Sequence, residues 1–289
     1  MELQWPLILF TTLLAWSAGL FGFQAFAALR GWARKTQLTA WIAAAVLLAA
    51  SGIAVFMHLE HWERIFNGFG HLTSGITQEL IAIVVLAVVA VVYLVLLRKS
   101  GEGTVPAWCA VVAMAVCAVL VVVCGHSYMM AARPVWDTVL AVGSLLGAAL
   151  LAGPLTLVAL AVLCGDDVAP LLKSVVVAAA IGSVLVVAYG AASQMAGDGF
   201  TQMGWYFDPT EPNAGIANPA AAVAEQALLV WLGGVVVGAA VPLGCALAAW
   251  RKPVVALPVA VVGALAAVAG AVMLRMAFYA AGLSVFPLY

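Results

Sequence analysis

The chain has 289 residues, of which 66% are hydrophobic and 8% are charged, with a net charge of -1 and a mean hydropathy of +1.18. No soluble fold buries that much apolar surface in a chain of this length, so the composition predicts an all-α, polytopic membrane protein. It excludes a nucleic-acid-binding protein, because the sequence has no basic cluster of the required size.

Eight apolar segments are each long enough to cross about 30 Å of hydrocarbon at a rise of about 1.5 Å per residue. We expect transmembrane helices at residues 6–29, 38–57, 76–97, 106–126, 136–163, 172–193, 220–249 and 254–276. Together they predict a single integral membrane domain over residues 1–289, an eight-helix bundle surrounded by membrane lipids.

The basic residues predict the orientation of this bundle. Eight of the eleven lie in or beside the connections after segments one, three, five and seven: Arg30, Arg34, Lys35, Arg98, Lys99, Lys173, Arg251 and Lys252. Since Lys and Arg are enriched on the cytoplasmic side, we expect both termini and the loops at 58–75, 127–135 and 194–219 to face outward. In a bacterial inner membrane that side is the periplasm. All four histidines fall on it.

The five cysteines form no C-x-x-C pair and lie within or at the ends of apolar runs. A free cysteine in such a setting behaves as a small hydrophobic residue. We therefore expect no iron–sulfur cluster to be held by this chain alone.

The stretch from Phe56 to Glu79 gathers three of the four histidines between two apolar segments. His58 ends the second segment, and Glu79 enters the third from the same side. A quinol releases two electrons and two protons, so its site needs proton acceptors near the membrane surface, and these two side chains suit that chemistry. The alternatives are purely structural, since a cation suits the carboxyl end of a helix and a carboxylate suits the amino end.

Other polar residues on the outward side could complete such a site. Tyr128 and Arg133, between segments four and five, could line a quinone headgroup pocket or mark the membrane interface. Arg275 and Tyr279 share one helix face because they are four residues apart. Arg64 could take part as well, or could form a solvated ion pair with neighbouring acids.

Five short motifs contain most of these residues: H-L-x-x-x-x-R-x-F-N at 58–67, Q-E-L at 78–80, Y-M-x-x-A-R-P-x-W at 128–136, G-P-L at 153–155 and R-x-x-F-Y at 275–279. In their order and spacing over essentially the whole chain, they resemble the membrane-anchor subunit of dimethyl sulfoxide reductase and related molybdoenzymes. The chain departs from that pattern at residues 60–62, where the family commonly has Gly or Pro after H-L.

The resemblance implies a haem-free subunit that oxidises menaquinol near the periplasmic face. Electrons would pass to a peripheral iron–sulfur subunit and then to a molybdopterin catalytic subunit, which determines the terminal acceptor. The family's histidine and glutamate map onto His58 and Glu79, which we predict to be catalytic. The predicted quinol-binding set, with no metal ligand, is His58, Arg64, Glu79, Tyr128, Arg133, Arg275 and Tyr279.

Three other functions remain open from the sequence. A haem b quinol cytochrome would need histidine ligands, and a relay of two haems needs them at two depths, whereas all four histidines here lie on one side. A secondary transporter would need ionisable residues or broken helices near the bilayer midplane, which is aliphatic in every segment. A purely structural anchor would leave the pairing of His58 with Glu79 unexplained.

Overall fold

The computed structural model describes residues 4–58, 61, 67, 70–196 and 219–283, and the regular elements in these ranges are all helices. Six spans are single helices, α1 (Trp5–Leu29), α2 (Gln37–Phe56), α3 (Gly75–Ser100), α4 (Ala107–His126), α5 (Val139–Leu163) and α6 (Ala169–Gln194). The short α7 (Pro219–Glu225) precedes a seventh span made of η2 (Leu229–Ala240) and α8 (Val241–Arg251), and the eighth contains η3 (Pro253–Val255) and α9 (Ala256–Ala281). In the described ranges, eight helices are thus long and apolar enough to cross a membrane, which confirms the predicted all-α fold.

The seventh span differs from the continuous helix expected at 220–249. A turn at Gln226 separates α7 from the rest, and residues Leu229–Ala240 form a wide π-helix before the regular α8 begins. Pro242 follows directly, and because proline has no N–H the α-helical bonding pattern cannot run unbroken through this point. The break between α7 and η2 places the start of the span near Leu229.

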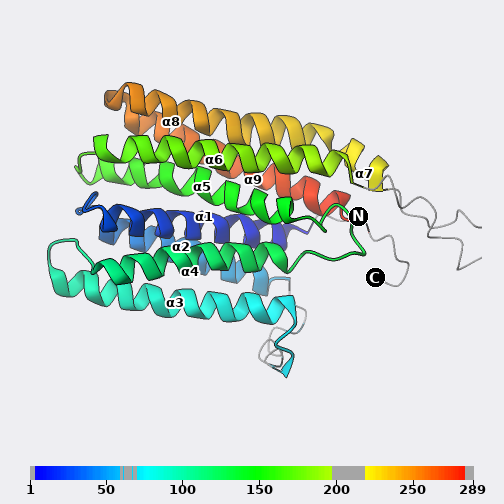
Figure 1. Cartoon of the computed structure of the whole chain (residues 1–289), viewed down its shortest axis with the longest axis horizontal. Helices are drawn as coiled ribbons and strands as arrows, with labels where there is room; N and C mark the ends of the chain where they lie inside the picture. Colours follow the sequence, from blue (N-terminus) through cyan, green and yellow to red (C-terminus); the bar gives the residue numbers. More distant parts are fainter. Residues whose placement is uncertain (1–3, 59–60, 62–66, 68–69, 197–218, 284–289) are drawn as a thin grey trace, which may run out of the picture.

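The bundle has two halves, α1–α4 and α5–α9, which meet mainly where α1 packs against α5 (Figure 1). At this seam the helices approach closely through glycines. A Cβ atom added to Gly19 would collide with the backbone of Ala149, and one added to Gly153 would collide with the backbone of Gly19. Gly238 and Gly270 allow an equally close approach between η2 and α9. Small residues of this kind let membrane helices gain van der Waals contact along their backbones.

The two ends of the bundle differ in chemistry. The basic end, at the left in Figure 1, holds the connections after α1, α3, α5 and α8 and the eight basic residues identified above. There the Asp166 carboxylate accepts hydrogen bonds from the Thr36 hydroxyl at 2.6 Å and the Thr36 N–H at 2.9 Å. The opposite end, called here the histidine end, contains His58, His71 and His126. Which end faces the cytoplasm stays a prediction.

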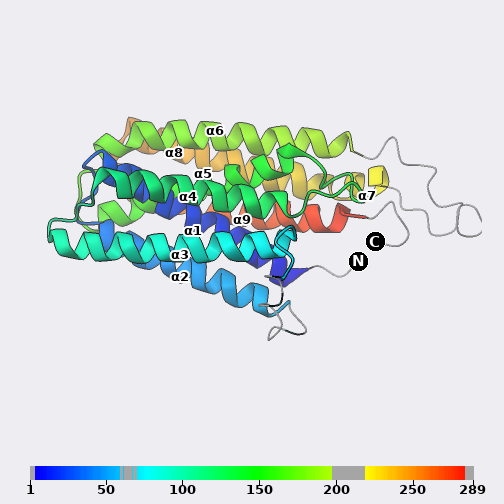
Figure 2. The same ribbon diagram turned by 60° about the horizontal axis from the view of Figure 1, so that its bottom comes forward.

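Helix α3 is packed unevenly. It lies along α4 but has few contacts with α2. Helices α2 and α3 form the lower edge of the bundle in Figure 2. One face of α3 points inward, with Glu79 at the histidine end, Leu86 in the middle and Tyr93 near the basic end, all buried. The Tyr93 hydroxyl donates a 2.7 Å hydrogen bond to the side chain of Gln37, which ties α3 to α2 at the basic end.

Candidate functional site

At the histidine end, aromatic side chains join the connection between α4 and α5 to the end of α9. The Trp136 ring stacks on Phe278 with centroids 4.9 Å apart, and its indole N–H donates to the Phe278 carbonyl at 2.7 Å. The Tyr128 ring meets Trp136, Phe278 and Tyr279 edge-on, each at 5.8 Å. Edge-to-face contacts at these distances are favourable, so the connection is held firmly on α9.

Arg133 supports this joint. Its guanidinium lies 4.5 Å from the centre of the Trp136 ring and donates a hydrogen bond to the carbonyl of Gly282. The backbone of Gly282 rests against the Trp136 indole so closely that a Cβ atom would collide with it. Partial burial lowers the pKa of Arg133 from its usual value. Arg133 thus joins the connection between α4 and α5 to Gly282, the residue that follows α9.

Glu79 lies one turn inside α3 and is buried, with 8% of its surface exposed. The Ser127 hydroxyl, just past the end of α4, is within hydrogen-bonding distance of its carboxyl group. Among the described residues, no Lys or Arg side chain forms an ion pair with Glu79. A buried ionisable side chain inside a membrane span is expensive, and by default it marks a functional site.

The Ser127 hydroxyl can serve Glu79 in either protonation state. It has a single proton and two acceptors within reach, the Glu79 carboxyl and the Cys124 carbonyl at 2.9 Å. When Glu79 is ionised, Ser127 donates to it. When Glu79 is protonated, its carboxyl group donates to the Ser127 hydroxyl, and that hydroxyl donates to the Cys124 carbonyl. Glu79 can therefore gain or lose a proton without a rearrangement of its surroundings.

Tyr128 extends this arrangement toward α9. Burial of its hydroxyl raises the pKa of Tyr128 well above the usual range, and the nearby Tyr279 hydroxyl, Cys124 thiol and Glu79 carboxyl raise it further. Tyr128 as a whole is half-buried. Tyr128 therefore stays a neutral hydrogen-bonding group beside Glu79 over the ordinary pH range.

Arg275 and Tyr279 supply the α9 side of the site. Arg275 is buried, donates a 3.1 Å hydrogen bond to the Ser144 hydroxyl and lies 4.9 Å from the Phe278 ring. The Tyr279 hydroxyl is also buried and lies close to the Tyr128 and Thr11 hydroxyls, but it meets no described residue with good hydrogen-bond geometry. A hydroxyl group placed in this way can donate a hydrogen bond to a bound molecule.

These side chains form one group, which we call the Glu79 cluster: Glu79, Cys124, Ser127, Tyr128, Arg275 and Tyr279. Three of the predicted quinol-binding residues besides Glu79 itself, Tyr128, Arg275 and Tyr279, thus lie in it. The sequence analysis missed Cys124 and Ser127. Their spacing relative to Tyr128, four residues and one residue before it, places all three close together at the end of α4 and was the available signal.

The other predicted residues lie apart from the cluster. His58 is exposed in the turn after α2, and its backbone N–H donates a hydrogen bond to the Val55 carbonyl at 3.0 Å. Among the described residues, no hydrogen bond or ion pair joins the His58 side chain to Glu79. Arg64 lies outside the described residues. The assignments of both residues, like the absence of haem, stay predictions.

One comparison with known proteins finds a relationship over nearly the whole length. The family model described as DMSO reductase anchor subunit (DmsC) matches residues 1–283. No curated protein matches the chain. The matched range includes all eight spans and the entire Glu79 cluster.

Proposed function

The chain belongs to the family of DMSO reductase anchor subunits, and on that premise we propose that it oxidises menaquinol at the Glu79 cluster within a molybdoenzyme complex. The observation that supports this most is the pairing of two groups. Glu79 has a partner suited to both of its protonation states, and the Tyr279 hydroxyl, on the other side of Tyr128, forms no hydrogen bond of good geometry with the described residues. A quinol headgroup offers what both need, because each of its hydroxyl groups can donate and accept a hydrogen bond.

The reaction releases two protons and two electrons from each quinol. Glu79 accepts the first proton, as an O–H bond of the quinol breaks and a new one forms on the carboxylate. It passes that proton to His58 and water before it accepts the second proton, from the other hydroxyl group of the quinol. Tyr279 donates a hydrogen bond to a quinol oxygen, and Arg275 supplies positive charge close by. The two electrons leave to an iron–sulfur partner subunit and then to a molybdopterin catalytic subunit, and the quinone returns to the lipid.

His58 has a different role in this proposal. Because it is exposed at the same end of the bundle as Glu79, it accepts protons from the site and releases them to water, as an imidazole side chain can do. Arg64, in the same loop, contributes to headgroup binding. Arg133 acts indirectly, since its contacts with Trp136 and Gly282 hold the connection that carries Tyr128.

The basic end faces the cytoplasm in this proposal, following the usual distribution of Lys and Arg. The Glu79 cluster and both termini then lie on the periplasmic side of a bacterial inner membrane. Protons and electrons leave on the same side of the membrane, so the oxidation of quinol in this subunit separates no charge by itself. The partner subunits would bind at that face.

The proposal can be tested with membranes that contain the assembled complex. Turnover is measured first with menaquinol as donor, and then with an artificial donor that reduces the catalytic subunit directly. We expect His58→Ala to lower menaquinol-driven turnover about tenfold or more and to leave turnover with the artificial donor and the amounts of the partner subunits unchanged. A wild-type complex that turns over with the artificial donor but does not oxidise menaquinol would reduce this chain to a structural anchor.

A further inference from the structure

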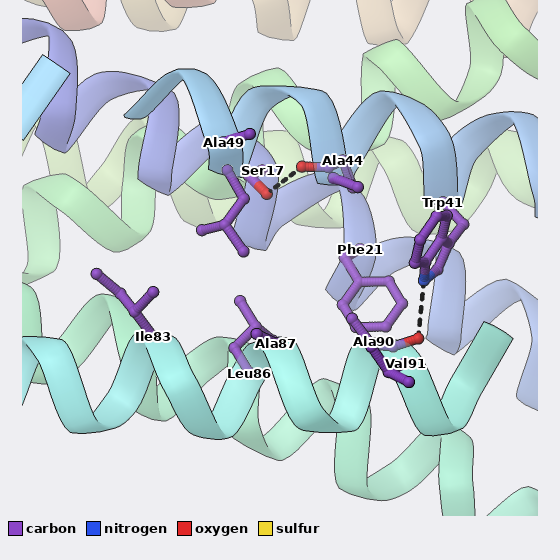
Figure 3. Close-up of a pocket in the computed structure, with 12 residues that line it drawn as sticks. Ser17, Phe21, Trp41, Ala44, Ala49, Ile83, Leu86, Ala87, Ala90 and Val91 are labelled. Atoms are coloured by element: carbon purple, nitrogen blue, oxygen red, sulfur yellow. Dashed lines mark hydrogen bonds between the residues drawn. The ribbon is translucent and has the colours of Figure 1, made fainter. Parts of the chain in front are cut away.

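A large apolar cavity lies between α2 and α3, against α1 (Figure 3). Its volume is about 340 Å³. The residues that line it are Ser17, Phe21, Trp41, Ala44, Ala45, Leu48, Ala49, Ile83, Leu86, Ala87, Ala90 and Val91. This volume is large enough for part of a ligand, and none of the residues of the Glu79 cluster lines it.

Among the described residues, the hydrogen bonds that join α2 to α3 lie toward the basic end. The Trp41 indole N–H donates to the Ala90 carbonyl at 2.9 Å, as Figure 3 shows, and the Gln37–Tyr93 hydrogen bond lies nearby. Toward the histidine end, the α2 wall is made of alanines and one leucine, which are too small to reach α3. Trp41 and Phe21 thus lie at the end of the cavity toward the basic end of the bundle, and Ala49 and Ile83 lie at its other end, on α2 and α3.

The lining offers a ligand nothing polar. The Ser17 hydroxyl donates to the Ala44 carbonyl at 2.7 Å, and the indole N–H of Trp41 is bonded to Ala90. All other lining side chains are apolar. The cavity suits a hydrocarbon chain, because a polar group placed there would lose its hydrogen bonds with water and gain none.

The cavity is accessible from the bilayer. Three of its lining residues, Ala49, Ala87 and Val91, are exposed on the outer surface of the helices, which in this protein is the lipid-facing surface. A chain could therefore slide in sideways between α2 and α3 without leaving hydrocarbon.

The cavity and Glu79 share one face of α3. Ile83 lies one turn below Glu79, and Leu86 and Ala90 continue the same face at helical spacing. At about 1.5 Å per residue, the lining begins about 6 Å from Glu79 along the axis and continues toward the basic end. A molecule with a polar head and an apolar tail could therefore occupy the cluster and the cavity together.

We propose that the cavity between α2 and α3 binds the isoprenoid tail of the quinol whose headgroup is oxidised at the Glu79 cluster. This inference rests on the proposed function, and it identifies the substrate by its tail as well as its headgroup. It also assigns a path for the substrate and product, in which quinol enters and quinone leaves between α2 and α3. Helix α3, which carries the proton acceptor, forms one side of that path.

A second apolar cavity provides a matched control. Its volume is about 380 Å³, and its lining, which includes Gly22, Ala118 and Leu185, comes from α1, α4, α5 and α6. None of its lining residues belongs to the α3 face that carries Glu79. Ala118 is exposed and lines this cavity, just as Ala87 is exposed and lines the first.

The expected effect of filling the cavity is limited in size. The tail already lies in hydrocarbon before it binds, so the cavity contributes van der Waals contact and alignment of the headgroup, with no hydrophobic gain. We expect Ala87→Phe in the assembled complex to raise KM for a menaquinol with a long isoprenoid tail roughly tenfold. KM for menadiol, which has the same ring system without the tail, should stay within about twofold of wild type. Ala118→Phe should change neither value.

The outcomes separate this inference from the proposed function. If Ala87→Phe leaves KM unchanged for both quinols, or raises both equally, the tail does not occupy this cavity, although quinol oxidation itself still stands. If Ala87→Phe changes only the phospholipid that copurifies with the complex, the occupant is an acyl chain and the inference is wrong. If the wild-type complex oxidises neither quinol, the proposed function fails first.

A second measurement uses the wild-type complex and does not depend on the folding of a variant. A menaquinone carrying a photoreactive diazirine on its tail is bound to the complex and irradiated, and the labelled residues are identified by mass spectrometry. We expect labels within 41–49 of α2 and 83–91 of α3. Labels confined to α4, α5 or α6 would overturn the inference.

Discussion

Two seams of the bundle, α1–α5 and α2–α3, illustrate opposite ways of placing membrane helices side by side. At the first, Gly19 and Gly153 bring the backbones so close that neither position has room for a Cβ atom. At the second, Trp41 and Tyr93 reach across by hydrogen bonds at the basic end, and the rest of the seam encloses a cavity. The comparison indicates that the closed seam holds the frame together, while the open seam leaves space for a molecule that is not part of the protein.

The largest loss of stability is expected where a larger side chain is placed in the α1–α5 seam. We expect Gly153→Val to force α1 and α5 apart and to destabilise the folded chain by about 3 kcal/mol or more, because the atoms in the way belong to the backbone of Gly19 and cannot swing aside. The measurement is the yield of assembled complex together with the unfolding temperature in lipid nanodiscs. A variant that assembles normally would show that the seam is not as tight as described.

Two tyrosines distinguish the site from the frame. Tyr279→Phe removes a hydroxyl that forms no hydrogen bond of good geometry with the described residues, so we expect unchanged stability and a KM for menaquinol raised about fivefold to tenfold. Tyr93→Phe removes a hydroxyl bonded to Gln37, so we expect a loss of about 1 kcal/mol in stability with KM unchanged. Thermal unfolding and steady-state kinetics of both variants check this. The opposite pattern would mean that the hydroxyl of Tyr93 on α3, and not that of Tyr279 on α9, binds the quinol.

The hydrogen bond that closes the cavity should contribute modestly. Trp41→Phe keeps an aromatic ring at the basic end of the cavity but loses the bond to the Ala90 carbonyl, which should cost about 0.5–1 kcal/mol. We expect a slightly lower unfolding temperature and full assembly. An increase in stability would mean that this bond is strained and does not hold α2 to α3.

The smallest change is expected at Gly52 in α2, where an added Cβ atom would meet nothing within 4 Å. Gly52→Ala should stabilise the chain by about 0.5–1 kcal/mol, since alanine loses less backbone entropy in a helix than glycine. This variant is the control for Gly153→Val. If the two glycine substitutions have similar effects, backbone entropy and not the closeness of the seam determines the cost.

Much of the frame could be predicted from the sequence, because membrane spans require long apolar helices whatever their tertiary contacts. The turn at Gln226 and the π-helix at Leu229–Ala240 could not, since both depend on local backbone hydrogen bonds. At the site, the shared face of Arg275 and Tyr279 followed from their spacing. The contact of Glu79 with Ser127 did not, because it joins residues 48 positions apart in the chain.

The cavity also could not be predicted from the sequence. Alanines at 44, 45 and 49 read as ordinary residues of an apolar helix, and only the position of α3 shows that nothing fills the space beside them. His58 illustrates the reverse limit. Its residue type and place in the chain suggested a catalytic role, yet it is exposed in the turn after α2, and among the described residues no hydrogen bond joins its side chain to Glu79.

The central claim, that Glu79 accepts a proton from quinol, is tested most directly by Glu79→Gln in the assembled complex. Glutamine has nearly the same shape and can keep a hydrogen bond with Ser127, but it cannot accept the proton. We expect menaquinol-driven turnover to fall about 100-fold or more, with turnover from the artificial donor and the content of partner subunits unchanged. Menaquinol-driven turnover equal to that of the wild type would contradict the account and place the proton acceptor elsewhere.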